Sequence, residues 1–397
     1  MMTRRRAIKL FIQVAVSVLL IGLLLWRIEF RDRITLADGE EIVGRIYAPA
    51  KTERVTPETE VVMVDSEGTQ RTFRVAALRD ARDIRFGFIS SVRTMDMVWA
   101  GLGFALMGLL PLTTGYRWQL LLRVQEVRLG LWTCLKLTVL GFFFDNVMPG
   151  STGGDVIKAY YVARQSHRKA EAAVSVFVDR FVGLCALAVL SGVAVAFGLG
   201  RPEFVQVAWI VLAFLGAVSV AGIVFFSRRI RRLVRLDAIL ARLPFQRIVQ
   251  RCDQAVFLYR YHKTAILWTL GLSVLTQVTA VISMYLIGRG LGVRGAAGPL
   301  GLQSYFVYFP VLMMVSAIPV APGGLGWREW AFAIFFGFAG VPAGMACALA
   351  VMYRVTRMVW SLPGALFLWG GRRVSTAEMA RELAEGTGAS ADPSGDS

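Results

Sequence analysis

Two glycine-rich breaks decide the fold of this chain: Pro149-Gly150-Ser151-Thr152-Gly153-Gly154-Asp155 and Pro322-Gly323-Gly324-Leu325-Gly326-Trp327-Arg328-Glu329. Each one interrupts an apolar stretch and leads into a new helical pattern. Proline removes a backbone donor and glycine weakens a helix, so such breaks survive at membrane depth only where protein or a watery cavity surrounds them. Paired breaks in the two halves of a hydrophobic chain indicate a substrate site near the middle of the membrane.

The composition predicts an integral membrane protein. Of the 397 residues, 56% are hydrophobic, and the mean hydropathy of +0.57 exceeds that of an ordinary soluble domain. Apolar stretches near the roughly 20 residues that cross a bilayer run over Ile8–Trp26, Met97–Tyr116, Val174–Leu199, Val205–Phe226, Ala265–Ile287 and Ala343–Trp369, while Leu131–Met148 and Pro299–Val320 end in the glycine-rich breaks. We expect the first stretch to be a retained anchor, because no A-x-A-like signal-peptidase cleavage site follows it and its length suits an anchor.

The charge of the chain predicts its orientation in a cell membrane. The formal net charge is +17, and the segment from Arg228 to Lys263 carries ten Lys or Arg residues against two acidic ones. Such a loop is cytoplasmic by the positive-inside rule, and both termini are expected on the same side, together with Arg117, Arg123 and Arg128. No nucleic-acid-binding motif accompanies the basic residues, so contact with anionic lipid headgroups is the simpler explanation.

Cysteine and histidine indicate neither a disulfide framework nor a metal centre. The four cysteines have no paired spacing, which predicts free thiols, and only two histidines are present. We therefore expect no metal and no cofactor.

The chain divides into four parts by composition. Residues 1–30 form the anchor, 31–93 a small extracytoplasmic β insert, 94–371 a membrane core, and 372–397 a polar cytoplasmic tail predicted to be disordered. Within the insert, alternating runs at Glu41–Tyr47, Glu60–Asp65 and Gln70–Ala76 predict an antiparallel unit that loosely resembles SH3-like or Sm-like barrels.

The membrane core is predicted to be all-α and to contain an inverted repeat. The segment after the first glycine-rich break, Val156–Arg164, is too short to cross and ends in basic residues, so Leu131–Arg164 is expected to form a re-entrant hairpin from the cytoplasmic side. Pro299–Gly340 would form the matching hairpin from the outside. The halves then match as helix, re-entrant hairpin and helix, with opposite orientation.

The hairpin tips are candidate binding elements. Free amides at the start of a helix favour an anion, and two positive helix ends converging at the midplane would suit an anionic headgroup. Asp155 and Glu329 lie in the first turns of the helices that follow the two breaks, where an acidic side chain caps the helix. A cation or a proton is therefore the alternative ligand.

Charges inside the predicted spans need partners, because a charge at the bilayer centre costs about 2.5–3.5 kcal/mol. Pairing of Arg180 with Asp179 or Asp155, and of Arg354 with Glu329, is one interpretation; direct contact of the arginines with a phosphate is the other. Asn146 either binds a headgroup or satisfies the broken backbone, and the latter is slightly favoured. The complete candidate set for substrate binding is Asn146, Pro149, Gly150, Gly153, Gly154, Asp155, Lys158, Asp179, Arg180, Pro322, Gly323, Gly324, Gly326, Glu329, Arg354 and Arg357.

These motifs resemble a known family. Asn146-x-x-Pro149-Gly150, Gly154-Asp155, Val178-Asp179-Arg180, Pro322-Gly323-Gly324-Leu325-Gly326-x-x-Glu329 and Arg354 occur in the order typical of the membrane region of lysylphosphatidylglycerol synthases and of related flippase-like proteins. The resemblance covers about Met95 to Gly371. The β insert is not part of that family core, and the aminoacyltransferase domain of the full-length synthases does not follow the last helix.

The resemblance implies a lipid translocase or transporter that handles an anionic-headgroup lipid between leaflets and is not an enzyme. Two alternatives stay open. One is a membrane-embedded transferase acting on a lipid phosphate, although no D-x-D signature of a conventional glycosyltransferase occurs in the chain. The other is an accessory subunit whose β insert recruits a protein partner. The expected partners are thus membrane lipids and not nucleic acid.

Overall fold

The computed structural model describes residues 32–35, 41–47, 60–65, 70–74, 84–85, 92–147, 153–166, 169–197, 202–226, 259, 261–295, 298–317 and 326–369. Several predictions lie outside these residues: the anchor, the basic loop, the tail, and the candidate site residues Pro149, Gly150, Pro322, Gly323 and Gly324.

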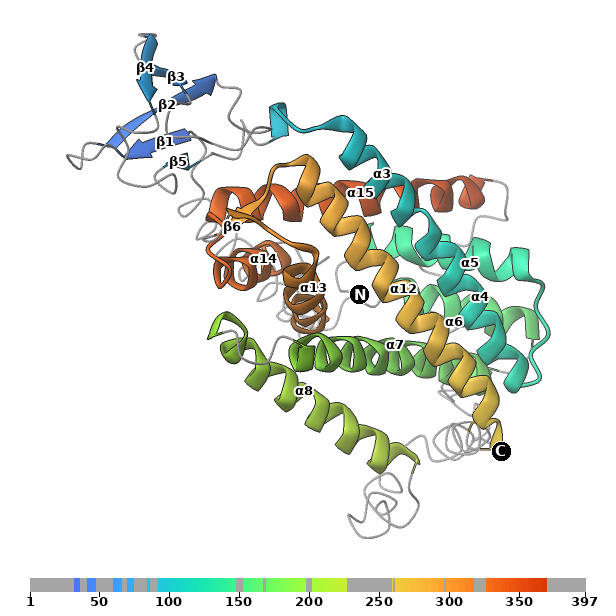
Figure 1. Cartoon of the computed structure of the whole chain (residues 1–397). Coiled ribbons are helices and arrows are strands. Elements are labelled where there is room, and N and C mark those ends of the chain that lie inside the picture. Colours follow the sequence, from blue (N-terminus) through green and yellow to red (C-terminus); the bar gives the residue numbers. More distant parts are fainter. Residues whose placement is uncertain are drawn as a thin grey trace, which may run out of the picture.

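The N-terminal strands form one antiparallel sheet (Figure 1). Its order is β4-β3-β2-β1-β5. Asp32 of β1 pairs with Gly44 of β2, and Gly44 in turn pairs with Asp65 of β3. The predicted strands are confirmed over the described residues, and Val75 and Ala76 of the third run lie outside them. The bounds are β1 Asp32–Thr35, β2 Glu41–Tyr47, β3 Glu60–Asp65, β4 Gln70–Arg74 and β5 Ile84–Arg85.

An antiparallel arrangement of helices organises the membrane core. Helices α3 (Met97–Met107) and α4 (Leu109–Val124) run in opposite direction to α12 (Lys263–Gly290), as Figure 1 shows. At one end the Asp96 N–H donates to Gly290 O over 2.8 Å. At the other end the Tyr259 hydroxyl donates to Leu121 O over 3.0 Å. The predicted span Met97–Tyr116 therefore continues to Val124.

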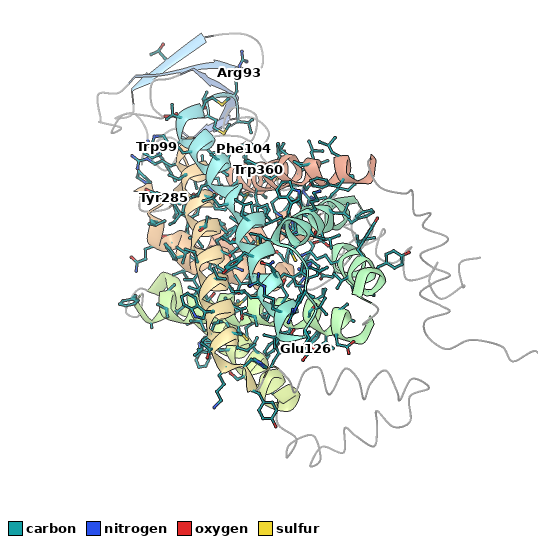
Figure 2. The ribbon with its side chains drawn as sticks, turned by 90° about the vertical axis from the view of Figure 1, so that its right-hand side faces the viewer. Arg93, Trp99, Phe104, Glu126, Tyr285 and Trp360 are labelled. Carbon is teal, nitrogen blue, oxygen red and sulfur yellow. The ribbon has the colours of Figure 1, made fainter. Side chains whose placement is uncertain are left out.

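A small residue permits the close approach of these helices. A Cβ at Gly103 would lie 2.7 Å from Ser283 O, and the Ser283 hydroxyl donates to Gly103 O over 2.6 Å. The break between α3 and α4 at Gly108 has a similar cause, since a Cβ there would lie 2.4 Å from the Trp360 ring. Figure 2 shows Trp360 beside Phe104, whose carbonyl accepts the indole N–H over 2.8 Å.

Each glycine-rich break separates two short helices. The first lies between α5 (Leu131–Val147) and α6 (Gly153–Ser166), and the second lies between α13 (Leu302–Ser316) and α14 (Trp327–Gly337). We call these helix pairs the first and second hairpins. A long helix follows each hairpin: α7 (Lys169–Phe197) after the first and α15 (Ala343–Trp369) after the second.

Each hairpin packs against the long helix that follows the other hairpin. Helix α5 of the first hairpin packs along α15, and α13 of the second packs along α7. Because Gly130 follows α4 and Gly301 follows α12, the hairpins also begin at opposite ends of the antiparallel α4–α12 pair. The remaining described elements are α8 (Pro202–Phe226), packed against α7 and α13, and a short ribbon of β6 (Arg294–Gly295) and β7 (Gly298–Pro299).

The core is richest in aromatic side chains around the second hairpin. Tyr305, Phe309, Phe332 and Phe336 are at most 1% exposed, and the Phe332 and Phe336 rings stack at 5.6 Å. By contrast, large apolar side chains cover the outer surface of the long helices, such as Phe197 (83% exposed). Among the described residues, three helices are long and apolar enough to cross a membrane: Met97–Val124, Glu171–Phe197 and Lys263–Gly290.

Candidate functional site

In the first hairpin, two carboxylates share one arginine of α7. Arg180 Nε donates to Asp155 Oδ2 over 2.6 Å, and Arg180 Nη2 lies 3.3 Å from Asp145 Oδ2. The Arg180 side chain is 51% exposed, whereas the carboxylates are 18% and 13% exposed. The predicted pair of Arg180 with Asp155 is confirmed, and Asp145 is a partner that sequence reasoning missed.

Glycine allows the two arms of the first hairpin to touch. A Cβ at Gly154 would lie 2.0 Å from Gly141 O, so no other residue fits there without displacing the backbone. The Gly154 N–H donates to Asp145 Oδ1 over 2.9 Å. One of the free amides that was expected to attract an anion is therefore already bound by the protein. Gly153 is the first residue of α6.

Lys158 lies one turn further along α6 and is buried among aromatic rings. Its ammonium is 5.2 Å from the Trp118 ring centroid and 5.7 Å from that of Phe142, while the residue is 5% exposed. Within the described part of the chain, no carboxylate lies within 4 Å of it. Ring faces attract a cation, and such contacts contribute about 2 kcal/mol or more when desolvated.

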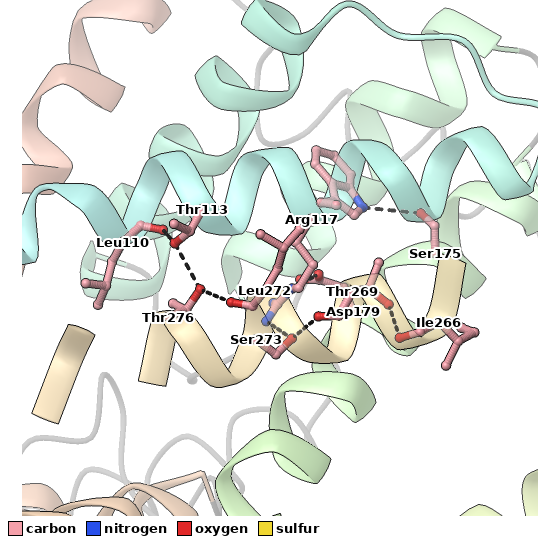
Figure 3. A network of polar contacts seen from close by, with 11 residues as sticks. Leu110, Thr113, Arg117, Ser175, Asp179, Ile266, Thr269, Leu272, Ser273 and Thr276 are labelled. Carbon is pink, nitrogen blue, oxygen red and sulfur yellow. Dashed lines mark hydrogen bonds and ion pairs between the residues drawn. The ribbon is translucent and has the colours of Figure 1, made fainter. Parts of the chain in front are cut away.

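The position of Arg117 corrects two predictions (Figure 3). It is not a loop residue at the cytoplasmic surface but a buried side chain of α4, 6% exposed. Its Nε donates to Asp179 Oδ1 over 2.8 Å, and its Nη1 donates to Ser273 Oγ over 2.8 Å. Asp179 thus pairs with Arg117 and not with Arg180, for which it was one of the two partners considered. This network joins α4, α7 and α12, and Asp179 is structural in the geometry observed.

Glu329 lies in the first turn of α14 and binds both an arginine and a backbone N–H. Its Oε1 accepts from Arg354 Nε over 2.8 Å and also from Arg354 Nη2. Its Oε2 accepts the Gly326 N–H over 2.9 Å, which caps α14. Gly326 has φ +77°, a left-handed conformation that favours glycine. The predicted pair of Arg354 with Glu329 is confirmed.

Two further arginines lie close to this pair. Arg357 Cζ is 5.7 Å from the Tyr353 ring centroid and 5.7 Å from that of Phe142, and its Nη1 lies 3.5 Å from the Tyr353 hydroxyl. Arg328 Cζ lies 5.7 Å from the same Tyr353 ring. Neither guanidinium forms an ion pair within the described ranges. Arg328 was not among the predicted site residues.

The two ion pairs occupy equivalent places. Asp155 and Arg180 are 25 residues apart, and Glu329 and Arg354 are also 25 residues apart. In both cases the acidic residue lies in the first turn after the break, and the arginine lies on the following long helix.

Contacts between α5 and α15 bring the two hairpins' charges toward one another. Phe142 of α5 lies beside both Lys158 and Arg357. Asn146, one turn later, donates to Phe142 O over 3.0 Å and to Ser361 Oγ over 3.2 Å. The favoured backbone role of Asn146 is therefore observed, together with a contact to α15.

Most of the described candidate residues gather in these two clusters. The first contains Gly154, Asp155, Lys158 and Arg180, and the second contains Gly326, Glu329, Arg354 and Arg357. The sequence offered a signal for two of the residues that were missed: Asp145 directly precedes Asn146, and Arg328 directly precedes Glu329. Arg117 carried no signal, because it lies near the end of an apolar stretch, where a loop residue is equally expected.

Comparison with known protein families gives a match over most of the chain. The family profile described as the lysylphosphatidylglycerol synthase TM region matches residues 86–364. That match begins directly after β5 and includes both hairpins.

Two proteins of Methanothermobacter thermautotrophicus, both described as UPF0104 membrane protein, are similar to the chain. One is 22% identical over 292 residues, covering 67% of this chain and 82% of the relative. The other is 23% identical over 290 residues, covering 65% and 79%.

Proposed function

The chain belongs to the lysylphosphatidylglycerol synthase TM-region family and is a multi-pass membrane protein, and from this premise we propose that it moves a lipid with an anionic headgroup between leaflets. It would act as a transporter and not as an enzyme. The observation that carries the proposal is the repeated acid–arginine pair beside each glycine-rich break, with the same separation of 25 residues in both halves.

The repeated pair supports an inverted repeat of two re-entrant hairpins. The hairpins begin at opposite ends of the α4–α12 pair, and each packs on the long helix of the other half. Related halves of opposite orientation offer two alternative packings of similar free energy, which is the basis of alternating access. In this arrangement both termini lie in the cytoplasm and the strands lie outside, where the sheet could also receive a protein partner.

The charged groups support an anionic substrate. Lys158 and Arg357 lie beside Phe142, and Arg180 and Arg354 bind the acidic residues after the two breaks. Arg354 and Arg357 lie within an apolar helix. Guanidinium groups bind phosphate with two parallel hydrogen bonds, and a low-dielectric surrounding strengthens the contact. The glycine-rich tips would contribute backbone amides in the same region.

A translocation assay tests the proposal. Proteoliposomes carrying a fluorescent anionic lipid should expose inner-leaflet probe to an external quencher faster than empty vesicles. Arg180→Ala and Arg354→Ala should each weaken lipid binding by about tenfold, because a charge-assisted contact contributes about 1.5–3 kcal/mol. Lysine at either position should recover only part of the rate, since a point charge cannot make the forked contact.

Two controls make the assay decisive. A variant at Arg289, which lies against Trp99 at the far end of α12, keeps the hairpins intact and should transport at the wild-type rate. No acceleration by folded wild-type protein with any of several anionic lipids would reject translocation and favour the transferase or accessory alternatives.

A further inference from the structure

The second hairpin holds more positive charge than its acidic group can balance. Arg328, Arg354 and Arg357 lie around a single carboxylate, that of Glu329, and Arg354 occupies it. Two guanidinium groups thus face Tyr353 without a carboxylate within ion-pair distance, as far as the described residues extend. Like charges repel strongly where the effective dielectric constant is low, so this arrangement needs an anion.

Arg328 has the clearest unmet requirement. Its Nε is buried, and among the described residues it has no hydrogen-bond acceptor. A buried donor without a partner is rare in a folded protein, because it loses its hydration and gains nothing in return. The guanidinium carbon lies 5.7 Å from the Tyr353 ring centroid, and a contact with a ring face gives the Nε–H no acceptor oxygen or nitrogen.

Arg357 lies against the same ring and is equally available. Its contacts are with the Tyr353 and Phe142 rings and with the Tyr353 hydroxyl. Tyr353 therefore has two arginine side chains beside it, and Phe142 connects the group to the first hairpin. An oxyanion beside Tyr353 would receive N–H donors from both arginines.

The first hairpin lacks this arrangement. By the shared spacing of the ion pairs, Gly154 is equivalent to Arg328, and Gly183 is equivalent to Arg357. Arg180 is already bound by two carboxylates. The extra arginines thus occur at only one of the two breaks, although both breaks have the same acid–arginine pair. The fold shared by the two halves therefore does not require them.

We propose that Arg328 and Arg357, which both lie beside the Tyr353 ring, form a subsite for the phosphate group of a lipid, and that this subsite favours a dianionic phosphomonoester over a phosphodiester. Two guanidinium groups match a monoester, which carries about −1.5 to −2 charges at neutral pH. The assignment to a lipid rests on the proposed function; the anion subsite itself does not.

A binding experiment on the full-length protein in detergent tests this. Phosphatidic acid supplies a phosphomonoester and phosphatidylglycerol a phosphodiester, and inorganic phosphate supplies the same anion without acyl chains. Wild type should bind phosphatidic acid more tightly than phosphatidylglycerol. Arg328→Gln and Arg357→Gln should each weaken binding of phosphatidic acid by about tenfold or more, which corresponds to about 1.4 kcal/mol per tenfold, and should reduce the preference for it.

Arg289→Gln is the matched control and should bind like wild type. Neither Arg328 nor Arg357 pairs with a described carboxylate. The melting temperature of each glutamine variant, measured without lipid, should therefore equal or exceed that of the wild type. A stable variant with weakened binding therefore supports the subsite. Unchanged affinity for phosphatidic acid in both variants would overturn it, equal wild-type affinity for both lipids would overturn the dianion assignment, and equally strong binding of inorganic phosphate would overturn the lipid source.

Equilibrium binding also separates this inference from the proposed function. Binding that depends on Arg328, without any acceleration of lipid exchange in vesicles, leaves the subsite intact and rejects translocation. If the wild type accelerates lipid exchange, and Arg328→Gln and Arg357→Gln change neither this rate nor the binding of phosphatidic acid, the subsite is rejected and translocation is kept.

Discussion

The two hairpins share a frame but differ in charge. In each, an acidic residue in the first turn after the break pairs with an arginine 25 residues later. In the first hairpin Asp145 adds a second carboxylate to Arg180, and the arginine is half exposed. In the second, Glu329 binds Arg354, while Arg328 and Arg357 lie beside the Tyr353 ring.

This difference separates what holds the fold from what is available to a ligand. An arginine bound by two carboxylates offers an anion only the N–H groups that those carboxylates leave unused. An arginine whose described contacts are mainly with aromatic rings has more of its donors available. The repeated ion pairs therefore position both breaks, and the residues that differ between the halves make the second break richer in donors for a charged group.

The largest expected effect concerns a pair that only the first half possesses. Asp179 is equivalent to Tyr353 and is bound by Arg117, with both side chains under 10% exposed. Arg117→Met leaves a buried carboxylate without its partner, so we expect unfolding free energy to fall by about 3–5 kcal/mol. Titration with a denaturing detergent, followed by circular dichroism, measures it.

The double variant Arg117→Met with Asp179→Leu is the control for that loss. Removing both charges together leaves no unpaired group, so most of the lost stability should return. If the single variant loses less than about 1 kcal/mol, the pair is not a structural support of the first half.

A smaller effect compares the two repeated carboxylates directly. Glu329→Gln removes the carboxylate charge that Arg354 binds, and we expect a loss of about 2 kcal/mol, typical of a hydrogen bond to a charged group. Asp155→Asn leaves Arg180 with Asp145 and with solvent, so its cost should stay below about 1 kcal/mol. The same detergent titration compares them, and equal losses would contradict the charge asymmetry.

Sequence reasoning identified the two breaks, the helices around them and both repeated ion pairs. It could do so because proline, glycine and charged residues inside apolar stretches are local signals, and a buried charge must have a partner. The strands at Glu41–Tyr47 and Glu60–Asp65 were found for a similar reason, from their alternating pattern.

The missed features depend on contacts between distant segments. Arg117 and Ser273 are 156 residues apart and meet only because α4 and α12 run antiparallel. The stop at Tyr116 was also wrong, since hydropathy treats an arginine as a boundary even where the fold supplies Asp179. Arg328 lies inside the most specific motif, yet only the positions of its described neighbours show that its buried Nε has no acceptor among them.

The central claim is that the two hairpins begin on opposite faces of the membrane, and cysteine labelling tests it most directly. Gly130 and Gly301, which precede α5 and α13, are both exposed and have open space where a Cβ would lie. Each is replaced by cysteine in a variant whose four native cysteines are alanine. An impermeant maleimide added to intact cells should label Gly301→Cys but not Gly130→Cys, and both should react after permeabilisation. Labelling of both from the same side would contradict the inverted repeat and the lipid path built on it.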